Sequence, residues 1–111
     1  MTKEQLIQIK AEELIPTAYL KKSVTTYNFY NIVLPLFINA YHEKDMFMND
    51  RAIGAPDYMT LSHKSAYEAY VKSLLLFYDE PNHLDEYDLK NAIYEALMDL
   101  RNYAYKLEAH Q

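Results

Sequence analysis

Cysteine and tryptophan are absent from this 111-residue chain, and glycine occurs once, at position 54. Without cysteine there is no disulfide, no thiolate nucleophile and no cysteine-ligated zinc or iron–sulfur cluster. A sheet protein of this length needs several tight turns, and the Asn-Gly and Asp-Gly pairs that usually form them are missing as well. The shortage of turn residues therefore favours an all-helical fold.

Long apolar runs are also lacking. The longest, residues 32–38, is interrupted by Pro35, and a membrane-spanning helix needs roughly 20 residues. Residues 2–13 alternate charged and aliphatic side chains, whereas a signal peptide has a basic start followed by an apolar block. We therefore expect a soluble, cytoplasmic protein that has no membrane partner.

A basic surface is missing too. The net charge is −5; residues 1–56 carry six basic and six acidic side chains, while residues 57–111 carry five basic and ten acidic ones. Proteins that bind nucleic acid normally present a basic patch, so we do not expect direct binding to DNA or RNA.

The composition supports a folded core. Half of the residues are hydrophobic and 24% are charged, which is ordinary for a globular protein and unlike a disordered chain. A length of 111 residues is typical of one domain. We predict a single all-α domain over residues 1–111, folded as a helical bundle of four to five helices.

The clearest helix is expected from Asp85 to Leu107. Pro81 stops any incoming helix and Asp85 is a good N-cap. Apolar residues then recur at the i, i+3/i+4, i+7 spacing of an amphipathic helix. The residues of this stripe are Leu89, Ile93, Ala96, Leu97, Leu100, Ala104 and Leu107.

The same helix carries a second stripe, roughly 130° away from the first at about 100° per residue. It consists of Tyr87, Tyr94, Met98 and Tyr105. Tyrosine is enriched at protein interfaces, so these four residues are candidates for binding a partner. They would equally fit a helix that is buried on two sides within its own domain.

Three further helices are expected. Thr2 and Gln5 have the spacing of a capping box, which begins a helix that ends near Leu14, and one or two turns can follow over residues 16–23. Residues 24–48 predict a largely apolar helix that Pro35 kinks or restarts, and it should pack at the centre of the bundle with the last helix. A third helix is expected from Thr60 or Ser62 to about Asp79.

Residues 49–61 show no helical periodicity and contain Gly54 and Pro56, which predicts a loop of about a dozen residues. Loops of this length are often functional. Ile53, Tyr58 and Met59 would then form an adaptable apolar surface for a partner protein. The alternative is that these side chains fold back under the loop and fill the core.

A cluster of five acidic residues lies in residues 79–88, which contain no basic side chain. Asp85, Glu86 and Asp88 are explained by the preference for carboxylates at a helix N-terminus. Asp79 and Glu80 are not, because the end of a helix disfavours negative charge. These two acids could dock on a basic partner or imitate nucleic-acid phosphates.

No pattern in the chain predicts catalysis, a metal or a cofactor. The histidines, at positions 42, 63, 83 and 110, lack the paired spacing of metal ligands, and no glycine-rich phosphate loop or nucleophile motif occurs. An enzyme would need two of the first three histidines to meet a carboxylate in one pocket.

The sequence thus favours a small non-enzymatic module that binds another protein, of the inhibitor, immunity or accessory type found in bacteria and phages. One alternative is a homo-oligomeric structural subunit of a larger, possibly phage, assembly, which would use the tyrosine stripe symmetrically. Another is an acidic nucleic-acid mimic that inhibits a DNA- or RNA-binding enzyme.

Overall fold

Helices dominate the computed structural model, which describes residues 1–79 and 86–109. They are α1 (Lys3–Leu14), α2 (Thr26–Asn28), the π-helical segment η1 (Phe29–Val33), α3 (Leu34–Ala52), α4 (Asp57–Leu75) and α5 (Glu86–Ala109). α2, η1 and α3 follow one another without a break and form one rod. The predicted all-α bundle is confirmed, with four helical rods in the part of the chain that the structure describes.

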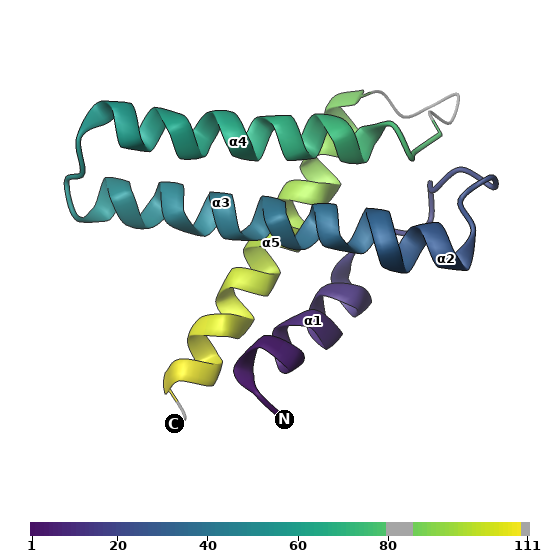
Figure 1. Cartoon of the computed structure of the whole chain (residues 1–111), viewed down its shortest axis with the longest axis horizontal. Helices are drawn as coiled ribbons and strands as arrows, with labels where there is room; N and C mark the ends of the chain where they lie inside the picture. Colours follow the sequence, from purple (N-terminus) through teal and green to yellow (C-terminus); the bar gives the residue numbers. More distant parts are fainter. Residues whose placement is uncertain (80–85, 110–111) are drawn as a thin grey trace.

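The rods form two layers. α3 and α4 run antiparallel as a long hairpin, α5 crosses this hairpin, and α1 lies beside α5 (Figure 1). The molecule measures 41 × 35 × 23 Å, and the shortest dimension equals about two helix diameters of roughly 10–12 Å each. An ion pair between Lys3 and Glu108 joins the beginning of α1 to the end of α5.

The ends of α1 follow its local sequence. Thr2 accepts a hydrogen bond from the backbone N–H of Gln5, and the Gln5 side chain accepts one from the backbone N–H of Thr2. This is the predicted capping box, and it satisfies two amides that a helix start leaves unpaired. The helix ends at Leu14, because Ile15 precedes Pro16 and is held in an extended conformation. Residues 16–23 contain turns but no helix.

Pro35 explains the π-helical segment. A proline inside a helix donates no hydrogen bond, and its ring crowds the carbonyl four residues earlier. The chain widens by one residue before Pro35, so that the N–H of Leu34 donates to the carbonyl of Phe29, five residues back. The rod therefore continues past the proline, starting after the Thr25 cap; such π-turns are a common response to a disturbed helix.

The predicted loop over residues 49–61 is wrong. α3 extends to Ala52, and the connection to α4 covers only residues 53–56. Gly54 adopts φ +73°, the left-handed conformation that ends a helix, and Pro56 occupies the N-cap position of α4. Thr60 is not a cap, since its hydroxyl donates to the Pro56 carbonyl within the first turn.

The missing periodicity of residues 49–61 has a structural cause. The earliest buried residue of α4 is Val71, and the end of the hairpin extends beyond the crossing with α5 (Figure 1). Helical turns that no apolar side chains cover need no apolar stripe.

The central core comes mainly from α5 and from the rod formed by α2, η1 and α3, as predicted. α5 buries Leu89, Ile93, Ala96, Leu97, Leu100 and Ala104, while Leu107 is half-buried. The large side chains that are almost wholly enclosed are Phe37, Leu34, Leu74, Ile93, Leu97, Leu100 and Val33. The expected N-cap of α5, Asp85, lies outside the described residues.

Candidate functional site

The tyrosine stripe of α5 is divided by the structure. Tyr87 is exposed over 69% of its surface, Tyr94 over 43% and Tyr105 over 42%, and Met98 is half-buried. Tyr94 and Tyr105 both contact side chains of α3. Tyr94 and Tyr105 therefore make contacts within the domain, whereas Tyr87 faces outward.

Tyr105 belongs to a polar network between α5 and α3. Its hydroxyl accepts a hydrogen bond from Arg101 at 2.7 Å and donates toward the Asn49 side-chain oxygen at 3.2 Å. Arg101 also donates to Asp45 at 3.1 Å. The sequence did not predict that Asp45, Asn49 and Arg101 meet, and only the crossing of the two helices brings them together.

Tyr94 belongs to a second cluster, where three helices meet. The Lys44 side chain of α3 lies between two rings, with its Nζ atom 4.1 Å from the ring centroid of Tyr94 in α5 and 4.7 Å from that of Tyr67 in α4. Lys44 is only 7% exposed. Burial lowers the pKa of Lys44, and the nearby Arg101 lowers it further. Burial also raises the pKa of Tyr67 to about 12.

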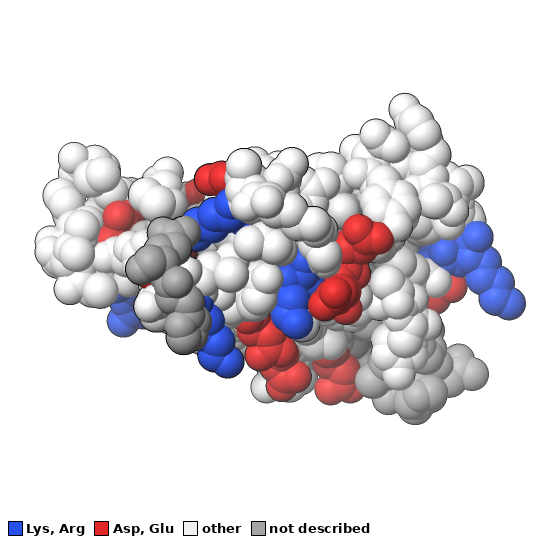
Figure 2. Space-filling model, turned by 90° about the horizontal axis from the view of Figure 1, so that it is seen from below, with Lys and Arg blue, Asp and Glu red and all other residues white. Residues whose placement is uncertain are grey.

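The free end of the hairpin exposes several large apolar side chains. Ile53 is 80% exposed, Tyr58 73%, Leu61 58% and Met59 42%. Tyr58 and Leu61 are three residues apart on α4 and so share a face. We refer to Ile53, Tyr58, Met59 and Leu61 as the hairpin tip; it lies at the left end of the molecule in Figure 1 and again in Figure 2, where this end shows few charged side chains.

The hairpin tip is separate from Tyr94, whereas Tyr105 reaches Asn49, four residues before Ile53. Lys44, the contact of Tyr94, lies nine residues before Ile53, which is about 13 Å along a helix that rises 1.5 Å per residue. Phe47, Met48 and Arg51 lie between Lys44 and Ile53 in the chain, and they line one cavity with Lys44 and Tyr94. The sequence pointed to Ile53, Tyr58 and Met59 but not to Leu61. Its position one helical turn after Tyr58 could have indicated that the two apolar side chains share a face.

The acidic cluster is only partly visible. Asp79 is exposed, and its backbone N–H donates to the carbonyl of Tyr19 at 2.8 Å. Glu80 and Asp85 lie outside the described residues. Across the middle of the face in Figure 2, acidic and basic side chains are intermixed.

One partly buried cluster of ionisable side chains was not predicted from the sequence. His63 of α4 lies between two carboxylates of α3, with Nδ1 2.6 Å from Glu43 Oε2 and Nε2 3.5 Å from Asp50 Oδ2. Asp50 is only 5% exposed. Glu43 and Asp50 are seven residues apart, which is two helical turns, and this spacing was the available signal.

The geometry of this cluster suits a clasp between helices. The two carboxylates lie at opposite nitrogens of the imidazole and so cannot converge with it on one ion. No group of three ligating side chains that could hold a metal occurs within residues 1–79 and 86–109. His42 is exposed on α3, and His83 lies outside the described residues.

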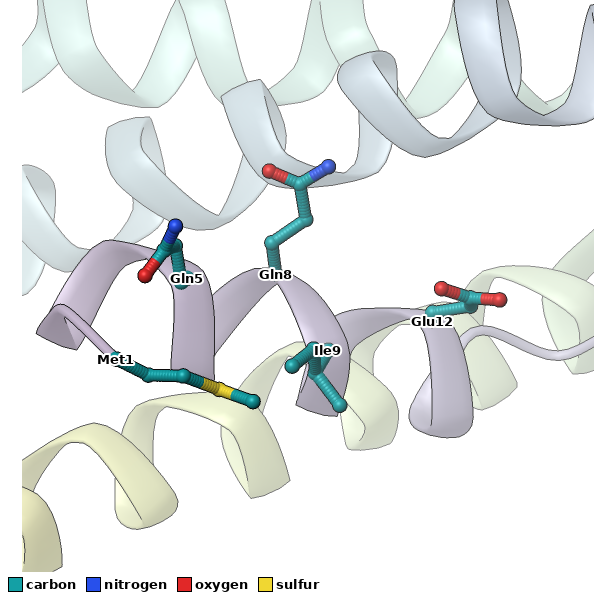
Figure 3. Close-up of a pocket in the computed structure, with 5 residues that line it drawn as sticks. All are labelled: Met1, Gln5, Gln8, Ile9 and Glu12. Atoms are coloured by element: carbon teal, nitrogen blue, oxygen red, sulfur yellow. The ribbon is translucent and has the colours of Figure 1, made fainter.

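The surface also contains a shallow groove along α1, with a volume of about 400 Å³. Met1, Gln5, Gln8, Ile9 and Glu12 line it, all from one helix end or face. Their side chains diverge, since Gln8 points toward α3 and Ile9 points the opposite way (Figure 3). No acid–base pair converges in this groove.

None of the helices in the described ranges is long and apolar enough to cross a membrane. Comparison of the chain with protein-family models, with curated proteins and with solved structures gives no significant match.

Proposed function

We propose that this chain is a non-enzymatic module that binds another protein through the hairpin tip. The observation that carries the proposal is the exposure of four large apolar side chains, Ile53, Tyr58, Met59 and Leu61, within nine residues. Exposed large apolar residues are common when scattered singly, whereas a contiguous group marks an interaction surface. An action of the inhibitor, immunity or accessory type fits a small domain whose function is stoichiometric binding.

The local structure supports rigid docking. The tip is built on the last turn of α3, a four-residue connection and the first turns of α4, so its side chains are held by helices instead of a long loop. Tyrosine and methionine offer large contact areas at a partner surface. A preformed surface binds with less loss of conformational entropy than a loop that must become ordered.

The test is a comparison of two charged variants. Ile53→Lys with Tyr58→Lys places two charges in the tip, and Tyr27→Lys places one at another aromatic residue, which is 72% exposed. Because interface hot spots cost at least about 2 kcal/mol, the tip variant should bind its partner roughly 30-fold more weakly. Tyr27→Lys should bind as the unmodified chain does.

The readout is capture from lysate of the source organism by each variant, followed by titration of any protein that the unmodified chain and Tyr27→Lys retain. Light scattering over a range of concentrations is run in parallel. A mass that rises with concentration, and that falls in the tip variant, would instead identify a homo-oligomeric subunit. Equal capture by both variants would refute the tip as the binding surface.

A further inference from the structure

The Lys44 side chain is buried, and among the described residues no anion pairs with its ammonium. Within the described residues, its recorded contacts are the rings of Tyr67 and Tyr94, and no carboxylate, hydroxyl or carbonyl hydrogen-bonds to it. Buried cations are normally paired, because burial removes their hydration. Cation–π contacts replace only part of that hydration.

The ammonium still has donor capacity on its open side. Lysine carries three N–H donors, and two aromatic rings face Lys44. In the described part of the chain, Asp50 Oδ2 is the one side-chain polar atom that is both fully enclosed and without a hydrogen bond. The Lys44 nitrogen also lacks a hydrogen bond, so it is not fully enclosed and retains some access to solvent.

Lys44 also lines a cavity of about 230 Å³ between α3 and α5, together with Phe47, Met48, Arg51 and Tyr94. We call it the Lys44 pocket. Two of its lining residues are cations, none is an acid, and the others are aromatic or a thioether. Arg51 is exposed and lies over the Phe47 ring at 5.6 Å.

The nearest acids of α3 are directed elsewhere. Asp45 is 3.1 Å from Arg101, and Asp50 lies against His63 at 3.5 Å. Neither lines the Lys44 pocket. The pocket thus combines a positive end with apolar walls, in a protein whose net charge is −5.

We propose that the Lys44 pocket binds a small organic carboxylate with an aromatic or branched apolar body. The carboxylate pairs with the Lys44 ammonium, the apolar body packs on Phe47, Met48 and Tyr94, and Arg51 closes the mouth. The volume is below the 300–1,000 Å³ typical of pockets for drug-sized ligands, so one small acid or a single acidic side chain fills it. This site is additional to protein binding at the hairpin tip.

The charge requirement is tested on the unmodified chain. Phenylacetate, its neutral analogue phenylacetamide and inorganic phosphate are titrated separately into labelled protein and followed by NMR. We expect saturable shifts for residues 44–51 and for Tyr94 with phenylacetate, at a dissociation constant of about 1 mM or tighter. Phenylacetamide and phosphate should bind at least tenfold more weakly.

Two variants assign the site. Lys44→Met keeps an unbranched apolar side chain and removes the charge, whereas Lys64→Met removes an exposed lysine of α4. Lys44→Met should lose at least tenfold in affinity for phenylacetate, and Lys64→Met should be unchanged. Circular dichroism confirms that both variants are folded; if Lys44→Met does not fold, Arg51→Met replaces it, with a smaller expected loss.

A blocked tripeptide amide with one glutamate between two apolar residues distinguishes the two sources of the carboxylate. Binding of this peptide more tightly than phenylacetate identifies an acidic side chain of a partner, and the reverse order identifies a free acid; either result supports the pocket. Equal binding of phenylacetate and phenylacetamide, preferential binding of phosphate, or unchanged binding by Lys44→Met overturns it. None of these results depends on the hairpin tip.

Discussion

Replacing Lys44 by methionine should make the protein more stable, although Lys44 is among its most buried residues. The ammonium lies between two tyrosine rings, and no anion of residues 1–79 and 86–109 is recorded beside it. Burying an unpaired ion costs several kcal/mol after relaxation, and two cation–π contacts return roughly 0.5–2 kcal/mol each. Because the ammonium keeps some access to solvent, only part of this desolvation cost applies, and we expect Lys44→Met to raise the free energy of unfolding by about 1 kcal/mol.

The pH dependence of this gain has a definite sign. Because burial lowers the pKa of Lys44, the folded protein releases this proton before the unfolded chain does. Between the folded pKa and the ordinary value of 10.5, the unfolded state binds more protons, so stability contributed by this site rises with pH. The advantage of Lys44→Met is therefore largest at neutral pH and shrinks toward pH 10.5.

Urea unfolding followed by circular dichroism measures both quantities, with Lys64→Met as the matched control. Thermal unfolding should agree, at roughly 4 °C per kcal/mol for a domain of this size. Measurements between about pH 7 and 9.5 stay below the ordinary pKa of tyrosine, near 10, so ionisation of the tyrosines contributes little to the difference. A loss of stability in Lys44→Met, or a gain that does not change with pH, would refute the reasoning.

Two further predictions concern stability. His63→Ala should cost about 1 kcal/mol in urea unfolding, because Glu43 loses its hydrogen-bond partner and the polar neighbour of Asp50 is removed; His42→Ala, at an exposed residue of α3, should change stability by less than about 0.5 kcal/mol. Equal effects would show that the His63 clasp contributes nothing. Burial raises the pKa values of Tyr41 and Tyr67 to about 12. Since tyrosine in the unfolded chain ionises near pH 10, stability should fall between pH 10 and 12, and less steeply in Tyr67→Phe; the same slope in both proteins would contradict the assignment.

Features that depend on neighbouring residues could be read from the sequence. The capping box of Thr2 and Gln5 forms as expected because its hydrogen bonds span three residues. The prediction of which α5 residues are buried is correct, because it follows from helical periodicity alone. Pro35 disturbs its helix as its missing N–H requires, although only the structure shows that the disturbance takes the form of a π-turn.

The hairpin was misread because hydrophobic periodicity reports burial, and helices that extend past their partners lose it. Residues 49–52 and 57–61 are helical, but the contacts that cover them are polar, such as His63 on Asp50 and Tyr105 on Asn49, so no apolar stripe marked them as helix. The exposure of Ile53 and Tyr58, which underlies the proposed protein-binding function, follows from this extension.

By itself, the amino-acid sequence determined that the chain is helical, where most helices lie and which face of α5 is buried, because these properties depend on interactions within one or two helical turns. Only the tertiary structure decided which side chains meet across helices. The crossing of α3 with α5 places Tyr94 against Lys44 and Tyr105 against Asn49, and the pairing of α3 with α4 places His63 between Glu43 and Asp50. An apolar stripe specifies that a helix packs, whereas the register and angle of packing come from the whole core at once.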